Sequence, residues 1–135
     1  MGIRRRDFLM AGATAVATVG SVSRAFAQRG GDMYGLIGKM TAAPGKRDEL
    51  ISILLEGAAT MPGCLSYIVA KDTGDANAIW ITEAWDSKAS HEASLSLPSV
   101  KEAIAKGRPL IAGFSDRVVT TPVGGTGLAL PDRPR

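Results

Sequence analysis

The stretch CLSYIVAKDTGDANAIWITEAWD, residues 64–86, decides the fold of this chain. Residues 64–71 and 78–86 are rich in β-branched and aromatic side chains, which favour strands. The cluster of Asp, Gly and Asn at residues 72–77 between them favours a turn. Two strands joined by a short polar turn predict an antiparallel hairpin.

A strand and a helix are expected before this hairpin. Residues 33–41 predict a strand between glycine- and proline-containing segments. Apolar residues then recur at helical spacing, which predicts an amphipathic helix from Pro44 to about Thr60. Proline suits a first helical position because its missing N–H has no partner there in any case. Met61-Pro62-Gly63 is expected to stop this helix.

Helical segments and a last strand are expected after the hairpin. Ser87 is a plausible N-cap for a helix over residues 88–97, and Ser99 for a short helix over residues 100–106. Residues 114–121 predict the last strand. The order β-α-β-β-α-β is the ferredoxin-like pattern, an α+β fold with helices on one face of an antiparallel sheet.

The strands are substantially apolar on both faces. In the third strand Ile79, Ile81 and Trp85 share one face, and Trp80 and Ala84 share the other. Two helices cover only one face of a sheet, so the other face needs a partner. A second copy of the chain, packed sheet to sheet with two-fold symmetry, is the expected partner, and an open ligand-lined face on a monomer is the alternative.

The N-terminus predicts an export signal rather than part of the fold. Arg4, Arg5 and Arg6 precede an apolar stretch at residues 9–22, and Ala25-Phe26-Ala27 provides a signal-peptidase site. The sequence RRDFL at residues 5–9 matches the twin-arginine pattern. We therefore expect cleavage after Ala27 and a periplasmic or secreted protein. An uncleaved anchor is the alternative, although the apolar stretch is short of the ~20 residues that span a bilayer.

Charge and composition restrict the function of the remaining chain. Residues 1–27 contain four of the 16 Lys and Arg residues and one of the 13 Asp and Glu residues, so the rest is formally neutral. This neutrality argues against nucleic-acid binding. The only cysteine, Cys64, is expected to be a buried, inert thiol. Residues 33–121 are expected to form one domain, and residues 122–135 a flexible tail rich in Gly and Pro.

The residues give no support for a cofactor or metal. No glycine-rich turn follows a strand and opens a helix, as the usual flavin and nicotinamide sites require. One histidine and one cysteine without clustered carboxylates do not make a metal site. We therefore expect no cofactor and no metal.

Several short motifs, in this order and spacing, carry a family resemblance: GK at residues 45–46, PGC at 62–64, EAWDS at 83–87, His91, SLSLP at 94–98 and RPLI at 108–111. Together they resemble the antibiotic biosynthesis monooxygenase domain, in particular its quinol monooxygenase branch. The resemblance implies a dimeric α+β barrel and the cofactor-free oxidation of a small phenol or quinol by molecular oxygen. The fold is the safer implication, since one fold serves several chemistries.

Five residues are candidates for such a site. His91, the sole histidine, is the candidate catalytic base because its ordinary pKa lies near neutrality; a surface or cap-proximal histidine is the alternative. Four candidates would contact the substrate, each with a structural alternative. Trp85 would line the pocket or the core, and Tyr67 would hydrogen-bond the substrate or lie in an interface. Glu83 would pair with a cation such as Arg108, either in the site or as a structural ion pair. Arg108 would stabilise negative charge or be a solvated cation at a helix end.

Two binding functions remain open beside the enzyme. Some relatives of this fold bind haem through an Asn-Trp-His set, which this sequence does not match well. A dimer that sequesters small aromatic molecules without turning them over is the other alternative. The expected partners of the enzyme are a second copy of the chain, a small aromatic substrate and oxygen, and the precursor is expected to meet the twin-arginine export machinery.

The export signal predicts the effect of replacing Arg5 and Arg6 together by lysine. Because the twin-arginine route recognises the arginine pair, the variant precursor should accumulate in the cytoplasm. Fractionation and immunoblotting measure the cytoplasmic and exported pools. A double substitution of Arg133 and Arg135, in the predicted C-terminal tail, by lysine serves as the control, and unchanged export of the Arg5/Arg6 variant would contradict the prediction.

Overall fold

The computed structural model of the chain describes residues 31–130. The predicted signal sequence at residues 1–27 lies outside the described residues. No helix within residues 31–130 has both the length and the hydropathy that a membrane crossing requires. The elements in chain order are β1 (Tyr34–Ala42), α3 (Arg47–Gly57), β2 (Cys64–Lys71), β3 (Ala78–Trp85), α4 (Lys88–Ser94), α5 (Pro98–Gly107), the 3-10 turn η1 (Arg108–Leu110) and β4 (Ile111–Thr120).

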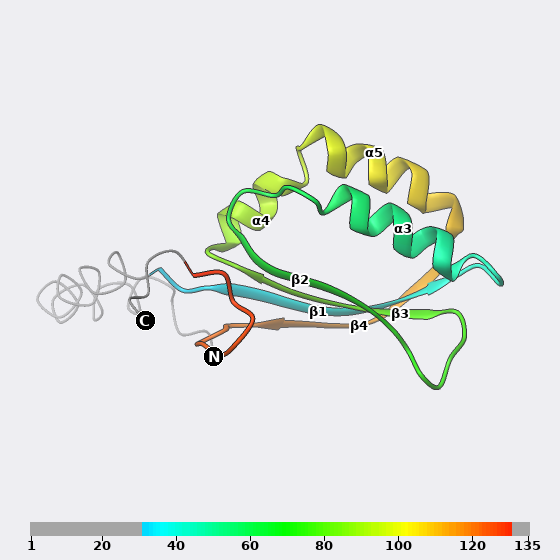
Figure 1. The fold of residues 1–135 in the computed structure, drawn as a ribbon, viewed down its shortest axis with the longest axis horizontal. Helices are drawn as coiled ribbons and strands as arrows, with labels where there is room; N and C mark the ends of the chain where they lie inside the picture. Colours follow the sequence, from blue (N-terminus) through cyan, green and yellow to red (C-terminus); the bar gives the residue numbers. More distant parts are fainter. Residues whose placement is uncertain (1–30, 131–135) are drawn as a thin grey trace, which may run out of the picture. The chain divides into compact units, whose positions relative to one another are not determined.

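The four strands form one antiparallel sheet in the order β2-β3-β1-β4, with β3 and β1 at its centre. Figure 1 shows α3 and α5 together on one face of this sheet, with the shorter α4 near one end. The helical segment after the hairpin is divided into α4 and α5. The element order and the two layers confirm the predicted ferredoxin-like α+β fold.

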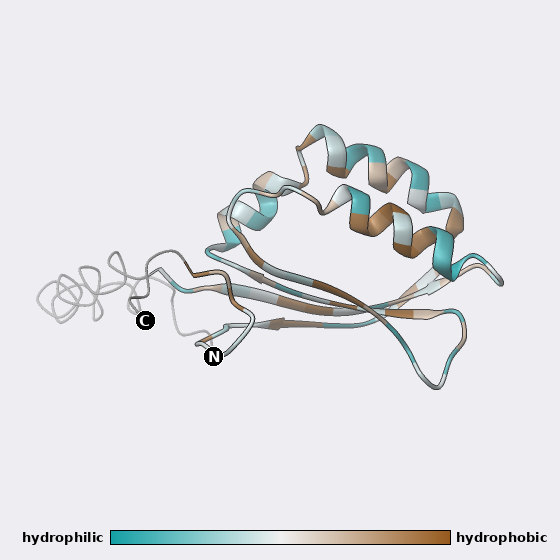
Figure 2. Ribbon diagram, viewed as in Figure 1, coloured by the Kyte–Doolittle hydropathy of each residue, from teal (hydrophilic) through white to brown (hydrophobic). Residues whose placement is uncertain are grey.

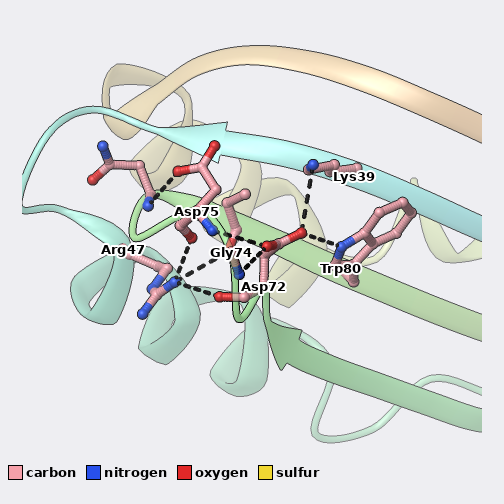
Figure 3. A network of polar contacts seen from close by, with 8 residues as sticks. Lys39, Arg47, Asp72, Gly74, Asp75 and Trp80 are labelled. Atoms are coloured by element: carbon pink, nitrogen blue, oxygen red, sulfur yellow. Dashed lines mark hydrogen bonds and ion pairs between the residues drawn. The ribbon is translucent and has the colours of Figure 1, made fainter.

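The structure confirms the predicted hairpin. The side chain of Asp72 organises its turn (Figure 3). One carboxylate oxygen accepts the backbone N–H groups of Gly74 at 2.7 Å and Asp75 at 2.9 Å. The other oxygen accepts the Nε1–H of Trp80 at 2.7 Å and lies 3.4 Å from the ammonium of Lys39. A single carboxylate thus joins the turn to β3 and to the neighbouring strand β1.

Arg47, the first residue of α3, is bonded to the same turn (Figure 3). Its guanidinium donates to the carbonyl oxygen of Asp75 at 2.9 Å and to that of Asp72 at 3.3 Å. The carbonyl of Asp75 also accepts the backbone N–H of Ala78 at 3.2 Å, so the guanidinium adds further hydrogen bonds to an already bonded turn. The hairpin therefore fixes where α3 begins over the sheet.

The start of α3 differs from the sequence expectation. Pro44 is not the first helical residue, because the helix begins at Arg47. Between them Gly45 has φ of 77°, a left-handed conformation that a continuous right-handed helix excludes. Pro44 and Gly45 form a turn instead, and the helix ends at Gly57 rather than near Thr60.

The predicted cap of α4 is confirmed. The hydroxyl oxygen of Ser87 accepts the backbone N–H of Ser90 at 3.1 Å. The helix ends earlier than expected, at Ser94, and α5 begins at Pro98 without a cap from Ser99. Proline at the first helical position loses no hydrogen bond, so Pro98 can begin α5, two residues before the expected start at residue 100.

The core lies between the helices and the sheet. Leu50, Ile79 and Trp85 are its largest fully buried side chains, and Figure 2 shows hydrophobic residues concentrated on α3 and on the strands beneath it. α3 and α5 approach closely, since a β-carbon at Gly57 would lie 2.5 Å from the β-carbon of Ala103. The two helices therefore form one continuous layer over the sheet.

The opposite face of the sheet carries a row of side chains that crosses all four strands and is apolar except for Thr82; it is called the apolar row below. Ile68, Thr82, Ile37 and Val118 follow one another in register from β2 to β4. Ile68 and Val118 are 56% and 52% exposed. Both faces of the sheet are therefore apolar, as the strand patterns predict, and within residues 31–130 no helix covers this open face.

The segment after β4 contacts the sheet. The backbone N–H of Ala129 donates to the carbonyl of Leu65, on the edge strand β2, at 3.0 Å. At the other end of the segment, a β-carbon at Gly35 would lie 3.0 Å from the Cγ of Pro122. Residues 121–130 contain no helix or strand. These two contacts show that the segment runs from the end of one edge strand, β4, to the other edge strand, β2.

The Asp72 network predicts an acid-sensitive contribution to stability. The hydrogen bond from Trp80, followed by that from the Gly74 N–H, lowers the pKa of Asp72 to about 2. A lowered carboxyl pKa stabilises the fold above the unfolded pKa near 4, and this stabilisation is lost as the pH falls through about 2. Asp72→Asn should therefore lower the Tm at pH 7 and reduce the difference in Tm between neutral and acidic solution.

Thermal unfolding followed by circular dichroism at a series of pH values tests this expectation. Asp116→Asn, at an exposed position on β4, is the matched control and should leave both Tm values close to those of the wild type. A Tm of Asp72→Asn equal to the wild-type value at neutral pH would contradict the role of Asp72.

Candidate active site

A cavity of about 520 Å³ lies between the helical layer and the sheet. Its volume falls in the range of sites that enclose small organic ligands. All five residues singled out from the sequence line this one cavity: Tyr67, Glu83, Trp85, His91 and Arg108. The fold thus brings together residues from two strands, one helix and the turn before β4.

The register of the sheet explains why three of these residues meet. Glu83 and Trp85 lie two positions apart on β3 and therefore point to the same face. Tyr67 on β2 is the direct cross-strand partner of Glu83. Side chains opposite each other in an antiparallel pair are close enough to interact, so Tyr67 and Glu83 occupy adjacent parts of the cavity wall.

Glu83 is the centre of a small polar cluster. Its Oε2 accepts the Nε1–H of Trp85 at 2.8 Å. The Nε2 of His91 lies 3.7 Å from the same oxygen. The side chains of His91 and Glu83 are only 14% and 17% exposed, so the carboxylate and the imidazole face each other in a largely water-excluded place.

Two aromatic rings confine His91. Its ring centroid lies 5.4 Å from that of Trp85, nearly perpendicular at 78°, and 5.2 Å from that of Tyr34. His91 is therefore packed against the sheet and is not a surface histidine, although it does lie close to the Ser87 cap of α4. Tyr34 had not been recognised as a neighbour of the site, although it is the cross-strand partner of Trp85 on β1.

The predicted pairing of Glu83 with Arg108 is wrong. Among residues 31–130 the ionic neighbour of Glu83 is His91. Arg108 lies exposed in η1, and a hydrogen bond from the N–H of Ala43 to the carbonyl of Leu110 anchors this turn at the end of β1. In the register of the sheet, Glu83 lies opposite Leu36, near the start of β1. η1 is anchored at the other end of that strand, so Arg108 lines a different part of the cavity wall.

Burial sets the protonation of two other groups near the cluster. Burial, and then the charge of Glu83, raises the pKa of Tyr67 far above its ordinary value. Tyr67 is therefore a neutral phenol that can donate a hydrogen bond into the cavity over the whole physiological range. Burial also raises the pKa of the Cys64 thiol, which agrees with the expectation of an inert thiol.

Ser94 also lines the cavity and is almost fully buried. Its hydroxyl donates to the backbone carbonyl of His91 at 2.6 Å. The hydroxyl thus acts within α4, and its hydrogen bond goes to the backbone of His91 rather than to the imidazole. This geometry does not resemble a serine nucleophile beside its base.

The mouth of the cavity is apolar. Leu95, Ile104 and Phe114 line it and are 49%, 42% and 73% exposed. From the sequence, Phe114 is predicted only to begin the last strand. No feature of the neighbouring sequence distinguishes an aromatic residue that lines a cavity from one that is simply exposed on an edge strand. Within residues 31–130 no three His, Cys, Asp or Glu side chains gather as metal ligands would.

Comparison with known proteins agrees with this fold. The family model described as antibiotic biosynthesis monooxygenase matches residues 33–106. A solved structure from Chloroflexus aurantiacus J-10-fl that carries this family's name is 68% identical, with a TM-score of 0.70, over 71% of this chain and 98% of that chain. None of the curated proteins matches.

More distant solved structures share the fold. A Caulobacter crescentus CB15 protein that carries the family's name is 24% identical over 66% of this chain and 86% of that chain, with a TM-score of 0.58. A variant of SnoaB, described as a cofactor-independent oxygenase from Streptomyces nogalater, is 16% identical over 70% and 97%, with a TM-score of 0.59. With most of its described domain matched by the family model, the chain belongs to the antibiotic biosynthesis monooxygenase family.

Proposed function

We propose that the protein is an exported, cofactor-independent monooxygenase that oxidises a small phenol or quinol with molecular oxygen. The observation that carries the proposal is the apolar cavity with His91, the one histidine of the chain, in its wall. SnoaB, which shares the fold, is described as a cofactor-independent oxygenase. The family to which the chain belongs carries the monooxygenase name.

The proposed reaction needs no external reductant. Molecular oxygen reacts slowly with closed-shell organic molecules, but an aromatic oxyanion donates an electron to it readily. For a quinol, one oxygen atom enters the ring as a new C–O bond and the other leaves as water, which takes two hydrogens from the substrate. The product is a hydroxyquinone, and the substrate supplies all the electrons that reduce the oxygen.

His91 is the proposed proton acceptor of the first step. A substrate O–H bond breaks, the electron pair stays on the substrate oxygen, and the proton moves to the imidazole. Trp85 and the neutral phenol of Tyr67 would position the ring by contact and hydrogen bonding. Arg108, in another part of the wall, would attract the anion. The apolar wall would exclude water from the reactive intermediate.

Replacing His91 by glutamine tests this assignment. Glutamine keeps a hydrogen-bonding side chain but cannot act as a base near neutral pH, and general-base assistance typically contributes ~10²–10⁴-fold. We therefore expect kcat/KM for oxygen uptake with a hydroquinone to fall at least ~10²-fold. An oxygen electrode and product analysis measure the rate, and the Tm reports whether the variant remains folded.

Lys88→Ala, at an exposed position on the same helix, is the control and should retain the wild-type rate. Wild-type turnover by folded His91→Gln would show that His91 is not the base. Wild-type protein that binds hydroquinone but consumes no oxygen would contradict the enzyme and identify an aromatic-binding module. A Soret band on addition of haem would identify the haem-binding alternative.

The proposal includes a homodimer formed through the open face of the sheet. The apolar row from Ile68 to Val118 lies on the face opposite α3 and α5. Two such faces packed together by a two-fold axis would remove this surface from water. The site itself lies on the helical side, so each subunit would contain its own cavity.

The double variant Ile68→Asp/Val118→Asp tests this interface. Burying two carboxylates from each chain in an apolar interface is strongly unfavourable, so the variant should sediment with the mass of one chain where the wild type sediments with the mass of two. Leu55→Asp, at an exposed position on α3, is the control and should remain a dimer. A monomeric wild type at micromolar concentration would contradict the proposed dimer.

A further inference from the structure

The carboxylate of Glu83 has a defined position and a defined neighbour. Its Oε2 accepts the Nε1–H of Trp85 at 2.8 Å, and the Trp85 side chain is 1% exposed. A buried indole has very little freedom to move. The Nε1–H group therefore fixes one oxygen of Glu83 in the cavity wall, and it satisfies the hydrogen-bonding capacity of the indole at the same time.

The same oxygen faces one particular nitrogen of His91. Nε2 lies 3.7 Å away, too far for a formed hydrogen bond but within the distance over which opposite charges interact strongly in a shielded site. Hydrogen bonds in an empty active site are often long and shorten when the substrate binds. Tyr34 and Trp85 lie against the imidazole ring, so its freedom to rotate away from Glu83 is limited.

We propose that Glu83 is the positioning residue of His91, a role that rests on His91 being the base of the proposed reaction. The carboxylate accepts the Nε2–H of the neutral imidazole, which leaves Nδ1 with the lone pair that takes the substrate proton. When the substrate O–H bond breaks, the proton moves to Nδ1, and the carboxylate stabilises the imidazolium that results. Glu83 then acts through His91 rather than by contact with the substrate.

The other charged groups near His91 are placed differently. Lys88 and Glu92 on α4 pair with each other at 3.7 Å, with exposed side chains, so their charges largely cancel and are screened by water. Arg108 lies in another part of the cavity wall. Tyr67, the cross-strand neighbour of Glu83, is neutral. Glu83 is therefore the charge that decides the electrostatic environment of the imidazole.

Glu83→Gln tests the proposal, because it removes the charge and keeps the shape of the side chain. His91 is the sole histidine, so the pH titration of its ring proton signals can be followed by NMR in the intact protein. Loss of the carboxylate removes the negative charge that faces the imidazolium at 3.7 Å, so the midpoint of this titration should move to lower pH. The acidic limb of the kcat/KM profile should move in the same direction, and kcat should fall about tenfold or more with little change in KM.

Glu92→Gln is the matched control. It removes a carboxylate from α4, the helix that carries His91, at a position outside the cavity, and it should change neither the titration nor kcat appreciably. Glu83→Asp keeps the negative charge but places it farther from His91, because the side chain is one methylene shorter. The midpoint of the His91 titration in this variant should fall between those of the wild type and Glu83→Gln. This second variant also serves if Glu83→Gln does not fold. An unchanged midpoint in folded Glu83→Gln, or equal shifts in Glu83→Gln and Glu92→Gln, would overturn the positioning role.

The two measurements separate this proposal from the proposed function. If the wild type consumes no oxygen with any phenol or quinol, the proposed reaction is wrong, and a shifted NMR titration still supports the pairing of Glu83 with His91. If the wild type is active and Glu83→Gln keeps both the wild-type titration and the wild-type kcat, the positioning role alone is wrong.

Discussion

Strand β3 is hydrogen-bonded along both of its edges, to β2 and to β1, and the rest of the structure depends on this double pairing. A shift of one residue in the register would move every side chain of the strand to the opposite face. Glu83 and Trp85 would then leave the cavity, and Trp80 would enter it. Register is costly to change in a strand that is paired on both sides, so the fold fixes the composition of the site.

The helical layer forms the other wall of the cavity and leaves a space between itself and the sheet. α3 and α5 meet through small residues such as Gly57 and Ala103, which lets their backbones approach closely. The sheet and the two helices then enclose the cavity from below and above, while the short α4 carries His91 to one end of it. A short, capped helix next to a central strand is a rigid way to place one imidazole.

Local patterns were sufficient for the hairpin and insufficient for the start of the first helix. The hairpin depends on contacts within residues 64–86, above all those of the Asp72 carboxylate with its own turn. The start of α3 depends on Arg47, which bonds to the carbonyl of Asp75, 28 positions away in the sequence. A search for helix start signals near Pro44 does not contain that information, because the bond exists only after the chain has folded.

The same distinction applies to the site. His91, Glu83, Trp85, Tyr67 and Arg108 were identifiable because their residue types suit the chemistry, and all five line the cavity. The sequence did not show which of the five residues pair with each other. Glu83 pairs with His91 instead of Arg108, and this depends on where η1 is anchored. Tyr34 and Phe114 reach the site only through the register of β1 and the position of β4 at the sheet edge.

The two tryptophans of the chain lie on opposite faces of one strand, and this gives the protein two separate optical reporters. The indole of Trp85 is buried beside the cavity, whereas that of Trp80 contacts Lys39 and Asp72 near the hairpin turn. Light emitted by the first indole depends on what occupies the site, and light emitted by the second depends on the opposite surface of the sheet. Single replacements by phenylalanine would assign each emission band, so changes in the cavity and changes on the open face of the sheet can be followed independently in one unlabelled protein.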